Sequence, residues 1–463
     1  MKLYIGGQWV APASDETIPV ENPATEEVLA EVPAGSSADV DRAVAAARAA
    51  FDGWAGTSLR ERGAVLDRLH AALEARAPEI ATTVGRELGT PLKVARAVQA
   101  GLPLTVLRGY ADLAVRERQP ETIGNSSIEH EPVGVVGAIT PWNYPLHQVV
   151  AKVAAALAAG CTVVLKPSEL TPLVAYLLFE AADEAGVPAG VLNLVTGTGP
   201  VAGAAIAGHP GVDMVSFTGS TATGRAISHA AADRIARVAL ELGGKSANVI
   251  LEDADLTKAV KVGVGNAFLN SGQTCTAWTR MLVHRSCYDE AVSLTAKTAS
   301  GYTVGDPFDE STRLGPLVSR AQRDRVRGFI ERASARLVAG GLDAPVPAKG
   351  HFVAPTVFAD VDQESELAQE EIFGPVLSII PFADDDEAVA IVNNSRYGLA
   401  GGVWGSPERA LAVARRMRTG AVDVNGGAFN PFAPFGGYKQ SGHGRELGAY
   451  GLAEFQQTKA IQR

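Results

Sequence analysis

Cys275 is the residue whose type and surroundings most directly suggest covalent chemistry. It lies in the segment NSGQTCTA, where Gly272 and the two flanking threonines would let the backbone come close to a substrate. A free cysteine has a pKa of about 8.5 and needs help from its surroundings to become a nucleophilic thiolate. Most cysteines are instead small buried apolar residues, and this segment alone is compatible with that role as well.

Two polar residues in other segments could assist such a nucleophile. Glu241 ends the apolar run RVALEL, and a carboxylate at the carboxyl end of a parallel strand suits a general base. The alternative is a strand-end glutamate that faces solvent, although its apolar neighbours Leu240 and Leu242 disfavour full exposure. Asn143 in PWNYP could direct its amide at a developing oxyanion, or could form an Asx-type turn before Pro145.

Two further segments have features of nucleotide binding. FTGSTATG ends an apolar run and opens a helical pattern, so the amides between Gly219 and Gly224 could face a pyrophosphate. The turn is not a Walker A motif, because Arg225 occupies the place of the lysine, and simple strand–helix packing would also explain it. In KPSE, Lys166 and Glu169 follow a strand, where an acidic residue can bind ribose hydroxyl groups.

The elements that would position these residues alternate between strands and helices. Short β-rich runs such as VGVVGAIT, CTVVLKP and VLNLVTG are separated by helical stretches. This alternation predicts a parallel, doubly wound sheet, in which ligands bind at the carboxyl ends of the strands. Residues 36–116 predict alanine-rich helices, with Ser37 as an N-cap and Pro78 dividing one long pattern into two helices. A second α/β block is expected over residues 245–430.

The composition indicates a globular protein. Of the 463 residues 46% are apolar and 20% are charged, which excludes intrinsic disorder. A net charge of −10 without a basic run makes nucleic acid and anionic membranes poor partners. Cys161, Cys275 and Cys287 are too few for a disulfide framework and lack metal-ligand spacing, so we expect a reducing compartment and no metal site. Without a targeting segment or an apolar stretch of membrane-spanning length, we expect a cytoplasmic protein with no membrane contact.

Seven segments, in order along the chain, resemble those of the aldehyde dehydrogenase superfamily, in its non-acylating NAD(P)-dependent branch. They are PWNYP, KPSE, FTGSTATG, LELGGKS, GQTCTA, EEIFGPV and PFGGYKQSGHGRELG. The resemblance implies an α/β fold with a Rossmann-like doubly wound cofactor domain, a second α/β catalytic domain and a small β oligomerisation arm. The cofactor domain would comprise residues 1–117 and 132–242, the catalytic domain residues 243–436, and the arm residues 118–131 and 437–463. The arm would consist of a hairpin at about Arg118–Glu131 and a strand at about Phe455–Gln462.

The same resemblance implies roles for individual residues. Cys275 would be the nucleophile and Glu241 the general base, Asn143 and the Cys275 backbone N–H would form an oxyanion hole, and Lys152 would join this catalytic set. The residues expected to bind the cofactor are Ile139, Thr140, Pro141, Trp142, Lys166, Ser168, Glu169, Gly199, Phe217, Thr218, Gly219, Ser220, Thr223, Leu242, Glu371 and Phe373. Those expected to form the substrate pocket are Tyr144, His147, Gln148, Ala151, Leu269, Thr274, Thr276, Phe429 and Phe435.

The implied reaction is oxidation of a small-molecule aldehyde to its carboxylic acid with NAD. It would proceed through a cysteine thiohemiacetal and a thioester that water hydrolyses. NADP is expected to be the weaker cofactor, because the carboxylate of Glu169 would repel its 2′-phosphate. A homodimer or a homotetramer is expected.

Two other functions are possible on the same fold. A CoA-acylating enzyme would transfer the acyl group to coenzyme A, but such relatives commonly lack the base that Glu241 provides. A catalytically silent binding protein is disfavoured, because Cys275, Glu241 and Asn143 occur together. Ala151 replaces an aromatic residue of many relatives, and His147 and Gln148 replace common apolar ones. The entrance should therefore be wider and more polar, favouring aromatic or medium-chain aldehydes over acetaldehyde.

Overall fold

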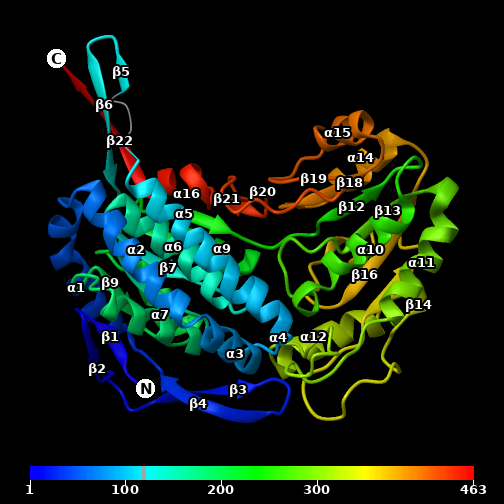
Figure 1. Ribbon diagram of the computed structural model, residues 1–463, viewed down its shortest axis with the longest axis horizontal. Helices are drawn as coiled ribbons and strands as arrows, with labels where there is room; N and C mark the ends of the chain where they lie inside the picture. Colours follow the sequence, from blue (N-terminus) through cyan, green and yellow to red (C-terminus); the bar gives the residue numbers. More distant parts are fainter. Residues whose placement is uncertain (117–120) are drawn as a thin grey trace.

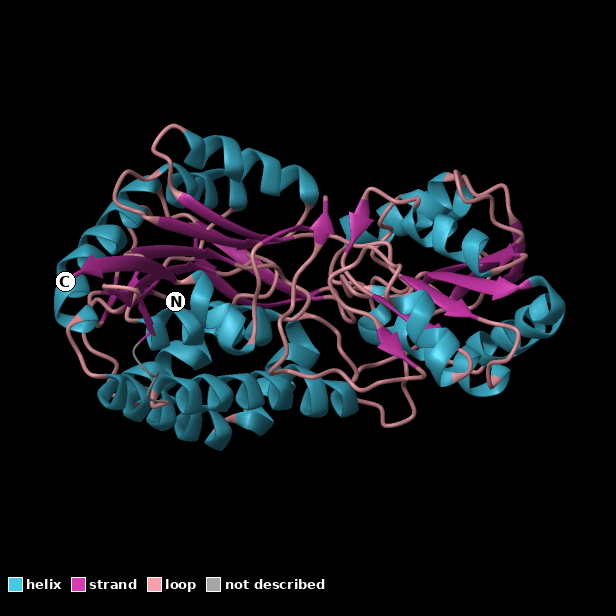
Figure 2. Cartoon of the chain, turned by 90° about the horizontal axis from the view of Figure 1, so that it is seen from above, coloured by secondary structure: helices cyan, strands magenta, loops and turns pink. Residues whose placement is uncertain are grey.

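The computed structural model describes residues 1–116 and 121–463, which form two α/β lobes lying side by side with a small sheet projecting from the first lobe (Figure 1). Each lobe has a twisted sheet with helices on both of its faces (Figure 2). The boundary expected at residue 117 and the start of the arm at Arg118 lie outside the described residues.

The sheet of the first lobe has eight strands in the order β2-β1-β9-β8-β7-β10-β11-β21. The five central strands pair with one another in parallel; they are β9, β8, β7, β10 and β11. The edge strands β1, β2 and β21 pair antiparallel with their neighbours. Along the chain, β8 and β9 follow β7 toward one edge of the sheet, and β11 follows β10 toward the other edge. The crevice beyond the carboxyl ends of β7 and β10 is therefore the expected ligand position. The strands are β1 (Leu3–Ile5), β2 (Gln8–Val10), β7 (Val135–Ile139), β8 (Thr162–Lys166), β9 (Leu192–Leu194), β10 (Met214–Thr218), β11 (Arg237–Glu241) and β21 (Gly442–His443).

Alanine-rich helices pack on this sheet and on one another. In α6 almost every residue is buried, because short side chains let neighbouring helices approach it from several sides. The helices are α1 (Ser37–Ala55), α2 (Leu59–Ala75), α3 (Ala77–Glu87), α4 (Leu92–Val94), α5 (Gly101–Ala114), α6 (Pro145–Ala159), α7 (Leu173–Glu184), α8 (Ala204–Gly208), α9 (Thr221–Ala232) and α16 (Gly448–Glu454), with π-helical turns η1 (Ala95–Ala100) and η2 (Gly199–Gly203).

The sequence predicts a break between two helices at Pro78 and the residue that caps α1. The predicted division near Pro78 is observed, since α2 ends at Ala75 and α3 starts at Ala77. The N-cap of α1 is Ser36 rather than the expected Ser37. The Ser36 hydroxyl accepts the Asp39 N–H, and the Asp39 carboxylate accepts the Ser36 N–H at 2.8 Å, so the two form a reciprocal capping box.

The sheet of the second lobe has seven strands in the order β14-β15-β16-β13-β12-β18-β19, and only the β14–β15 pair is antiparallel. Its strands are β12 (Ala247–Ile250), β13 (Arg280–His284), β14 (Arg336–Ala339), β15 (Thr356–Ala359), β16 (Val376–Phe382), β18 (Gly401–Trp404) and β19 (Asp423–Val424). Its helices are α10 (Leu256–Ala267), α11 (Tyr288–Ser300), α12 (Arg320–Glu331), α13 (Glu366–Gln369), α14 (Asp385–Asn393) and α15 (Pro407–Ala414), with short 3₁₀ turns η3 (Leu269–Gly272) and η4 (Arg285–Cys287).

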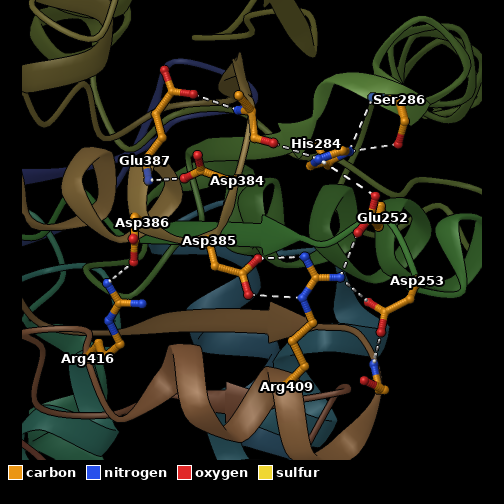
Figure 3. A network of polar contacts seen from close by, with 12 residues as sticks. Glu252, Asp253, His284, Ser286, Asp384, Asp385, Asp386, Glu387, Arg409 and Arg416 are labelled. Atoms are coloured by element: carbon orange, nitrogen blue, oxygen red, sulfur yellow. Dashed lines mark hydrogen bonds and ion pairs between the residues drawn. The ribbon is translucent and has the colours of Figure 1, made fainter.

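A polar network joins the elements at the carboxyl ends of this second sheet (Figure 3). Arg409 on α15 makes two bonds to the carboxylate of Asp385 on α14, at 2.9 and 2.7 Å. It also bonds to Glu252 just after β12 at 3.0 Å. His284 at the end of β13 bonds to the Ala383 carbonyl at 2.8 Å. The network therefore connects two helices to the loops that follow three strands.

The projecting arm is an antiparallel sheet in the order β22-β6-β5, built from β5 (Glu121–Ile123), β6 (Ser126–Pro132) and β22 (Gln456–Gln462). The rest of the C-terminal segment lies against the lobes: β20 (Tyr438–Lys439) pairs with β17 (Tyr397–Gly398), and β21 pairs with β11. Within residues 437–463, only β22 pairs with the hairpin, so the arm is narrower than the sequence suggested. A separate two-stranded hairpin consists of β3 (Thr17–Asn22) and β4 (Glu27–Pro33). None of the helices in the described ranges is long and apolar enough to cross a membrane.

Candidate active site

A cavity of about 550 Å³ lies where the two lobes meet. The loops that follow β7, β10 and β11 in the first sheet contribute to it, as do the loops that precede β12, β13 and β16 in the second. Its lining residues are Pro141, Trp142, Asn143, Gln148, Thr218, Gly219, Ser220, Thr221, Ala222, Arg225, Leu242, Gly243, Cys275, Gln322, Arg325, Glu370, Glu371, Phe373, Arg396 and Tyr397. The carboxyl edge of one sheet thus faces the amino edge of the other across a single cavity.

Cys275 lines this cavity and is half-buried. Three residues with positive φ precede it in close succession: Asn270 at 52°, Ser271 at 59° and Gly272 at 74°. Gly272 cannot be replaced without a shift, because a Cβ there would lie 2.1 Å from the Gly374 carbonyl oxygen. Burial raises the pKa of the Cys275 thiol, and the carboxylates of Glu371 and Glu241 raise it further. The free thiol is therefore mainly protonated at neutral pH.

Asn143 lines the same cavity and is held by hydrogen bonds on both its side chain and its backbone. Its Nδ2 donates to the carbonyl oxygen of Gln273 at 2.9 Å, two residues before Cys275. This bond uses one of the two N–H groups of the amide and leaves the other for an acceptor in the cavity. The arrangement suits stabilisation of an oxyanion formed next to Cys275.

Glu241 is the last residue of β11 and is 5% exposed. Neither of its carboxylate oxygens has a hydrogen-bond partner among the described residues. Burial raises the pKa of Glu241 well above its ordinary value, and the carboxylate of Glu446 adds to this effect while Lys152 opposes it. Lys152 itself forms an ion pair with Glu446 and donates to the Thr218 hydroxyl at 2.7 Å. A carboxylate with a raised pKa and no fixed partner suits proton transfer.

Glu371 belongs to the loop that precedes β16. Its Oε1 accepts the backbone N–H of Gly244 at 2.9 Å, and a Cβ on Gly243 would lie 2.2 Å from its Oε2. Burial raises the pKa of Glu371 to about 7, although the Gly244 N–H acts in the opposite direction. Next to it, Phe373 packs edge-on against Trp142 with ring centroids 5.2 Å apart. A carboxylate and an aromatic pair therefore stand on the wall of the cavity.

A second group of predicted cofactor residues lies at or just after the ends of β8 and β9. Lys166 Nζ donates to Glu169 Oε2 at 2.9 Å, and the Gly199 N–H lies 3.5 Å from Glu169 Oε1. Burial acts to raise the pKa of Glu169, but the charge of Lys166 and the hydrogen bonds outweigh it, so the pKa lies below its ordinary value. The carboxylate is thus ionised and partly accessible, as a ribose diol would require.

The turn after β10 also fits a phosphate group. Ser220 caps α9 by accepting the Thr223 N–H at 3.2 Å, and the first residues of this helix line the cavity. A Cβ on Gly219 would lie 2.5 Å from the Phe217 ring, so a larger residue there would force this ring to shift. A helix N-terminus and an ionised carboxylate therefore occur along the same sheet edge, which suits a dinucleotide.

The remaining predicted cofactor residues occupy the same region without lining the cavity. The Thr140 N–H donates to the Lys166 carbonyl at 3.1 Å, and Ile139 pairs with Lys166 across β7 and β8. Ser168 is buried in the loop that follows β8. Ile139, Thr140, Lys166, Ser168, Glu169, Gly199, Phe217 and Thr223 lie outside the lining of the 550 Å³ cavity.

The residues predicted to form the substrate pocket are more widely spread than those predicted to bind the cofactor. Of its nine residues, only Gln148 lines the 550 Å³ cavity, with a buried Oε1 that has no partner among the described residues. The Tyr144 hydroxyl bonds to Thr274 Oγ1 at 2.7 Å, and Phe429 packs edge-on against Phe435. Burial lowers the pKa of His147 to about 4, with a smaller effect of Lys152, so its imidazole is neutral. Leu269 and Thr276 are half-buried on either side of Cys275 in sequence. Ala151 is 1% exposed and packs in the core.

Three residues near the site were not anticipated. Glu446 pairs with Lys152 although it is 294 positions away, and its place in the quoted segment GRELG was the only available signal. Lys245 is buried with no partner for its Nζ among the described residues, and burial lowers its pKa to about 7. Gln99 donates to the Asn143 carbonyl from a π-helical turn that no sequence pattern indicated. The described part of the chain contains no cluster of three or more His, Cys, Asp or Glu residues able to hold a metal ion.

The fold and this site define an oxidoreductase built on two facing α/β lobes, and the comparison with known proteins agrees. The aldehyde dehydrogenase family model matches residues 9–461, so the chain belongs to the aldehyde dehydrogenase family and is an enzyme that oxidises aldehydes. A 3-succinoylsemialdehyde-pyridine dehydrogenase of a Pseudomonas species is 50% identical, over 99% of this chain and 98% of that protein. A geranial dehydrogenase of Castellaniella defragrans is 46% identical over the same shares of the two chains.

Solved structures give the same result. A mutant of aldehyde dehydrogenase C from Pseudomonas syringae, in complex with NAD+ and octanal, has a TM-score of 0.98 and 50% identity, covering 100% of this chain and 96% of that one. An NAD+ complex of an aldehyde dehydrogenase from Bacillus cereus has a TM-score of 0.97 and 42% identity over the same shares. The predicted family, fold class and activity are therefore confirmed.

Proposed function

We propose that Cys275 is the nucleophile of an NAD-dependent, non-acylating aldehyde dehydrogenase. The observation that carries this proposal is that Cys275 and the Asn143 amide line one cavity, with the amide bonded to the carbonyl of Gln273 just before the cysteine. The thiolate would add to the aldehyde carbonyl, and the negative charge would move to the carbonyl oxygen. The free N–H of Asn143 and the backbone N–H of Cys275 would stabilise that oxyanion.

NAD, when bound, would accept the hydride that leaves the thiohemiacetal carbon, and a thioester on Cys275 would remain. Glu371 would bind a ribose at the reactive end of the cofactor, and Lys166 and Glu169 would bind the adenosine ribose. The positively charged nicotinamide ring of NAD+, when bound next to Cys275, would also favour the thiolate. That charge would lower the pKa of Cys275 and so counteract the carboxylates of Glu371 and Glu241, which raise this pKa in the free enzyme.

Glu241 would then take a proton from water, and the resulting hydroxide would attack the thioester. The acid product would leave and the thiol would be restored. Lys152 would hold Glu446 through its ion pair and lower the cost of charging Glu241.

Replacement of Cys275 tests this proposal. Cys275→Ala should bind NAD with nearly wild-type affinity but should produce no NADH from any aldehyde, with or without coenzyme A. Cys287→Ala, which removes a thiol outside the lining of the cavity, serves as the matched control and should retain the burst of NADH. Turnover by the alanine variant at a rate comparable to wild type would exclude a covalent mechanism at this cysteine.

The cofactor preference follows from Glu169. Its carboxylate can accept hydrogen bonds from both hydroxyl groups of the NAD ribose, whereas the 2′-phosphate of NADP would meet a negative charge. Two like charges about 4 Å apart repel by roughly 4 kcal/mol at an effective dielectric of about 20, and solvent around the partly exposed carboxylate reduces this value. NADP should therefore be used, but more weakly than NAD.

Measurement of kcat/KM with both cofactors tests this preference. Glu169→Gln should narrow the ratio of NAD to NADP, mainly by improving NADP, because the repulsion is lost and one acceptor oxygen is kept. Glu180→Gln on the exposed side of α7 removes the same charge elsewhere and should leave the ratio unchanged. A wild type that prefers NADP, or a ratio that does not move in Glu169→Gln, would contradict the assignment.

The wider setting of the enzyme is part of the same proposal. The substrate would be an uncharged aromatic or medium-chain aldehyde, because the pocket candidates Gln148 and His147 are neutral and the aromatic pair Phe429 and Phe435 belongs to the same predicted pocket. The chain would work in the cytoplasm, where its three free cysteines stay reduced. It would do so as a homodimer or homotetramer assembled through the arm.

A further inference from the structure

A closed set of buried polar side chains lies behind the candidate oxyanion site. Gln99 and Asn270 both donate to the backbone carbonyl oxygen of Asn143, at 3.0 and 2.8 Å. The Thr90 hydroxyl donates to Asn270 Oδ1 at 2.8 Å, which fixes the Asn270 amide with its Nδ2 toward Asn143. All four side chains are at least 96% buried. The carbonyl of Asn143 is therefore held from behind by two amide groups.

The same set holds the loop that carries Cys275. Asn143 Nδ2 donates to the Gln273 carbonyl at 2.9 Å, and Gln273 Nε2 donates back to the Asn270 carbonyl at 3.1 Å. Gln273 Oε1 accepts the Val318 N–H at 2.9 Å, so this side chain is tied to a third segment. The candidate nucleophile and the candidate oxyanion donor thus share one hydrogen-bonded frame.

The backbone of this frame is strained where it bends. Asn270 and Ser271 both adopt left-handed conformations, which cost free energy for residues with a side chain and persist only where the surroundings impose them. Gln99 belongs to the π-helical turn η1, an irregular geometry that occurs frequently at functional sites. The left-handed residue Asn270 and the π-helical residue Gln99 therefore both donate to the carbonyl oxygen of Asn143.

Gln99 has a further feature that stability does not explain. Its Oε1 is buried without a partner among the described residues. A buried acceptor without a hydrogen bond destabilises the folded state, so an apolar side chain of similar size would be tolerated at least as well if packing were the only requirement. The Nε2 group of Gln99 does form a hydrogen bond, and its acceptor is the carbonyl oxygen of Asn143.

We propose that Thr90, Gln99 and Asn270 are positioning residues, which preorganise Asn143 and the Cys275 loop for attack on the aldehyde carbonyl. This inference rests on the proposed role of Asn143 as an oxyanion donor. Thr90 orients the Asn270 amide, and Asn270 and Gln99 donate to the Asn143 carbonyl, so all three position Asn143. Asn143 in turn holds the Cys275 loop through its bond to the Gln273 carbonyl. Small displacements of a reacting group can reduce a rate by up to about 10²-fold, which makes such a frame consequential.

The experiment measures the burst of NADH in a stopped-flow instrument, the Kd for NAD and the Tm of each variant. Gln99→Met and Thr90→Val remove one donor each with little change in volume, and each should slow the burst by about 5- to 50-fold. The Kd for NAD should stay within about twofold of wild type, because the side chains of Thr90, Gln99 and Asn270 bond to one another, to Asn143 and to Gln273, and not to residues expected to bind cofactor. Thr90→Ser keeps the hydroxyl and should restore most of the rate. Thr295→Val, which removes a buried hydroxyl on α11, should leave the burst unchanged.

A double-mutant cycle separates positioning from general destabilisation. Asn143→Ala alone should slow the burst by about 10²- to 10³-fold, the usual effect of removing one oxyanion donor. If Gln99 and Thr90 act through Asn143, their substitutions should add less than about twofold in that background. Full additivity, or an equal loss in Thr295→Val, would overturn the positioning role while leaving the proposed function intact. A normal burst in Asn143→Ala would instead refute the oxyanion role on which the inference depends.

Discussion

At the scale of single residues, the environment of Glu241 makes a separable prediction for the second half of the reaction. Glu241→Gln should lower the steady-state rate by about 10²–10⁴-fold, the usual contribution of a general base, while the first burst of NADH persists. The acyl group should then accumulate on Cys275 and be detectable by mass spectrometry. An equal loss in burst and steady state would mean that the carboxylate also activates the thiol.

The raised pKa of Glu241 gives this prediction a pH dependence with a definite sign. A base acts only when it is ionised, and a carboxyl group is ionised only above its pKa. The wild-type rate of thioester hydrolysis should therefore rise with pH in a range above that of an ordinary glutamate, and Glu241→Gln should show a flatter profile. A wild-type hydrolysis rate that falls as the pH rises through this range would contradict the assignment of Glu241 as base.

The site residues divide into those that sequence reveals and those that it does not. Cys275, Glu241 and Asn143 stand in segments that resemble those of a known family, and that resemblance is what singled them out as candidates. Thr90 lies in the short loop between α3 and α4, and Gln99 lies in a helical stretch. Both become relevant only because folding brings Thr90 to Asn270, 180 positions away, and Gln99 to the Asn143 carbonyl, 44 positions away. Burial likewise decides the pKa of Glu241 and of Lys245, and burial is a property of the folded chain.

At the scale of elements, the network around Arg409 should stabilise the second lobe without affecting catalysis (Figure 3). Its guanidinium bonds to both oxygens of Asp385, a geometry that lysine cannot reproduce. Arg409→Lys should lower the free energy of unfolding by about 1.5 kcal/mol, near the lower value for a hydrogen bond to a charged group. Urea denaturation followed by circular dichroism would measure this change.

The second arginine of that network provides the control. Arg416 bonds to Asp386, whose side chain is 86% exposed, and solvent-exposed ion pairs contribute little. Arg416→Lys should therefore change the free energy of unfolding by less than about 0.5 kcal/mol. Both variants should bind NAD like wild type, since the network lies at the carboxyl ends of the second sheet and the cavity at its amino ends. A similar loss in both would refute the special role of the two-bond contact.

The elements themselves were largely predictable, and the differences have physical reasons. Buried parallel strands such as β8 and β10 read as continuous apolar runs, which is why the doubly wound sheet could be inferred from sequence. Strands such as β19 and β21 have only two residues each, too few for any periodicity to be visible. The pairing of β21 with β11 is a tertiary contact over some 200 positions, and it moves residues 437–455 from the expected arm to the lobes.

At the scale of the whole molecule, the arm is the sheet with the least burial within the single chain. Its strands β5, β6 and β22 contain no buried residue, and within the described part of the chain the outer edges of β5 and β22 pair with no other strand. Figure 1 shows this sheet extending away from the first lobe. A small sheet without a core is marginal in water, and open edges are sites of pairing with other chains. Contact with a second copy would supply both the missing burial and the missing partners.

The arm therefore predicts an oligomer whose size depends on its exposed surface. Ile123 on β5 is 62% exposed, and Ile123→Asp would place a charge where a second copy would have to bury it. Light scattering coupled to size-exclusion chromatography should give a dimer or tetramer for wild type and a smaller species for this variant, with the Kd for NAD unchanged. Val28→Asp on β4 is the matched control, because Val28 is 61% exposed but lies outside the arm, and its oligomer should keep the wild-type mass. A monomeric wild type, or an Ile123→Asp variant of undiminished mass, would show that assembly does not run through this surface.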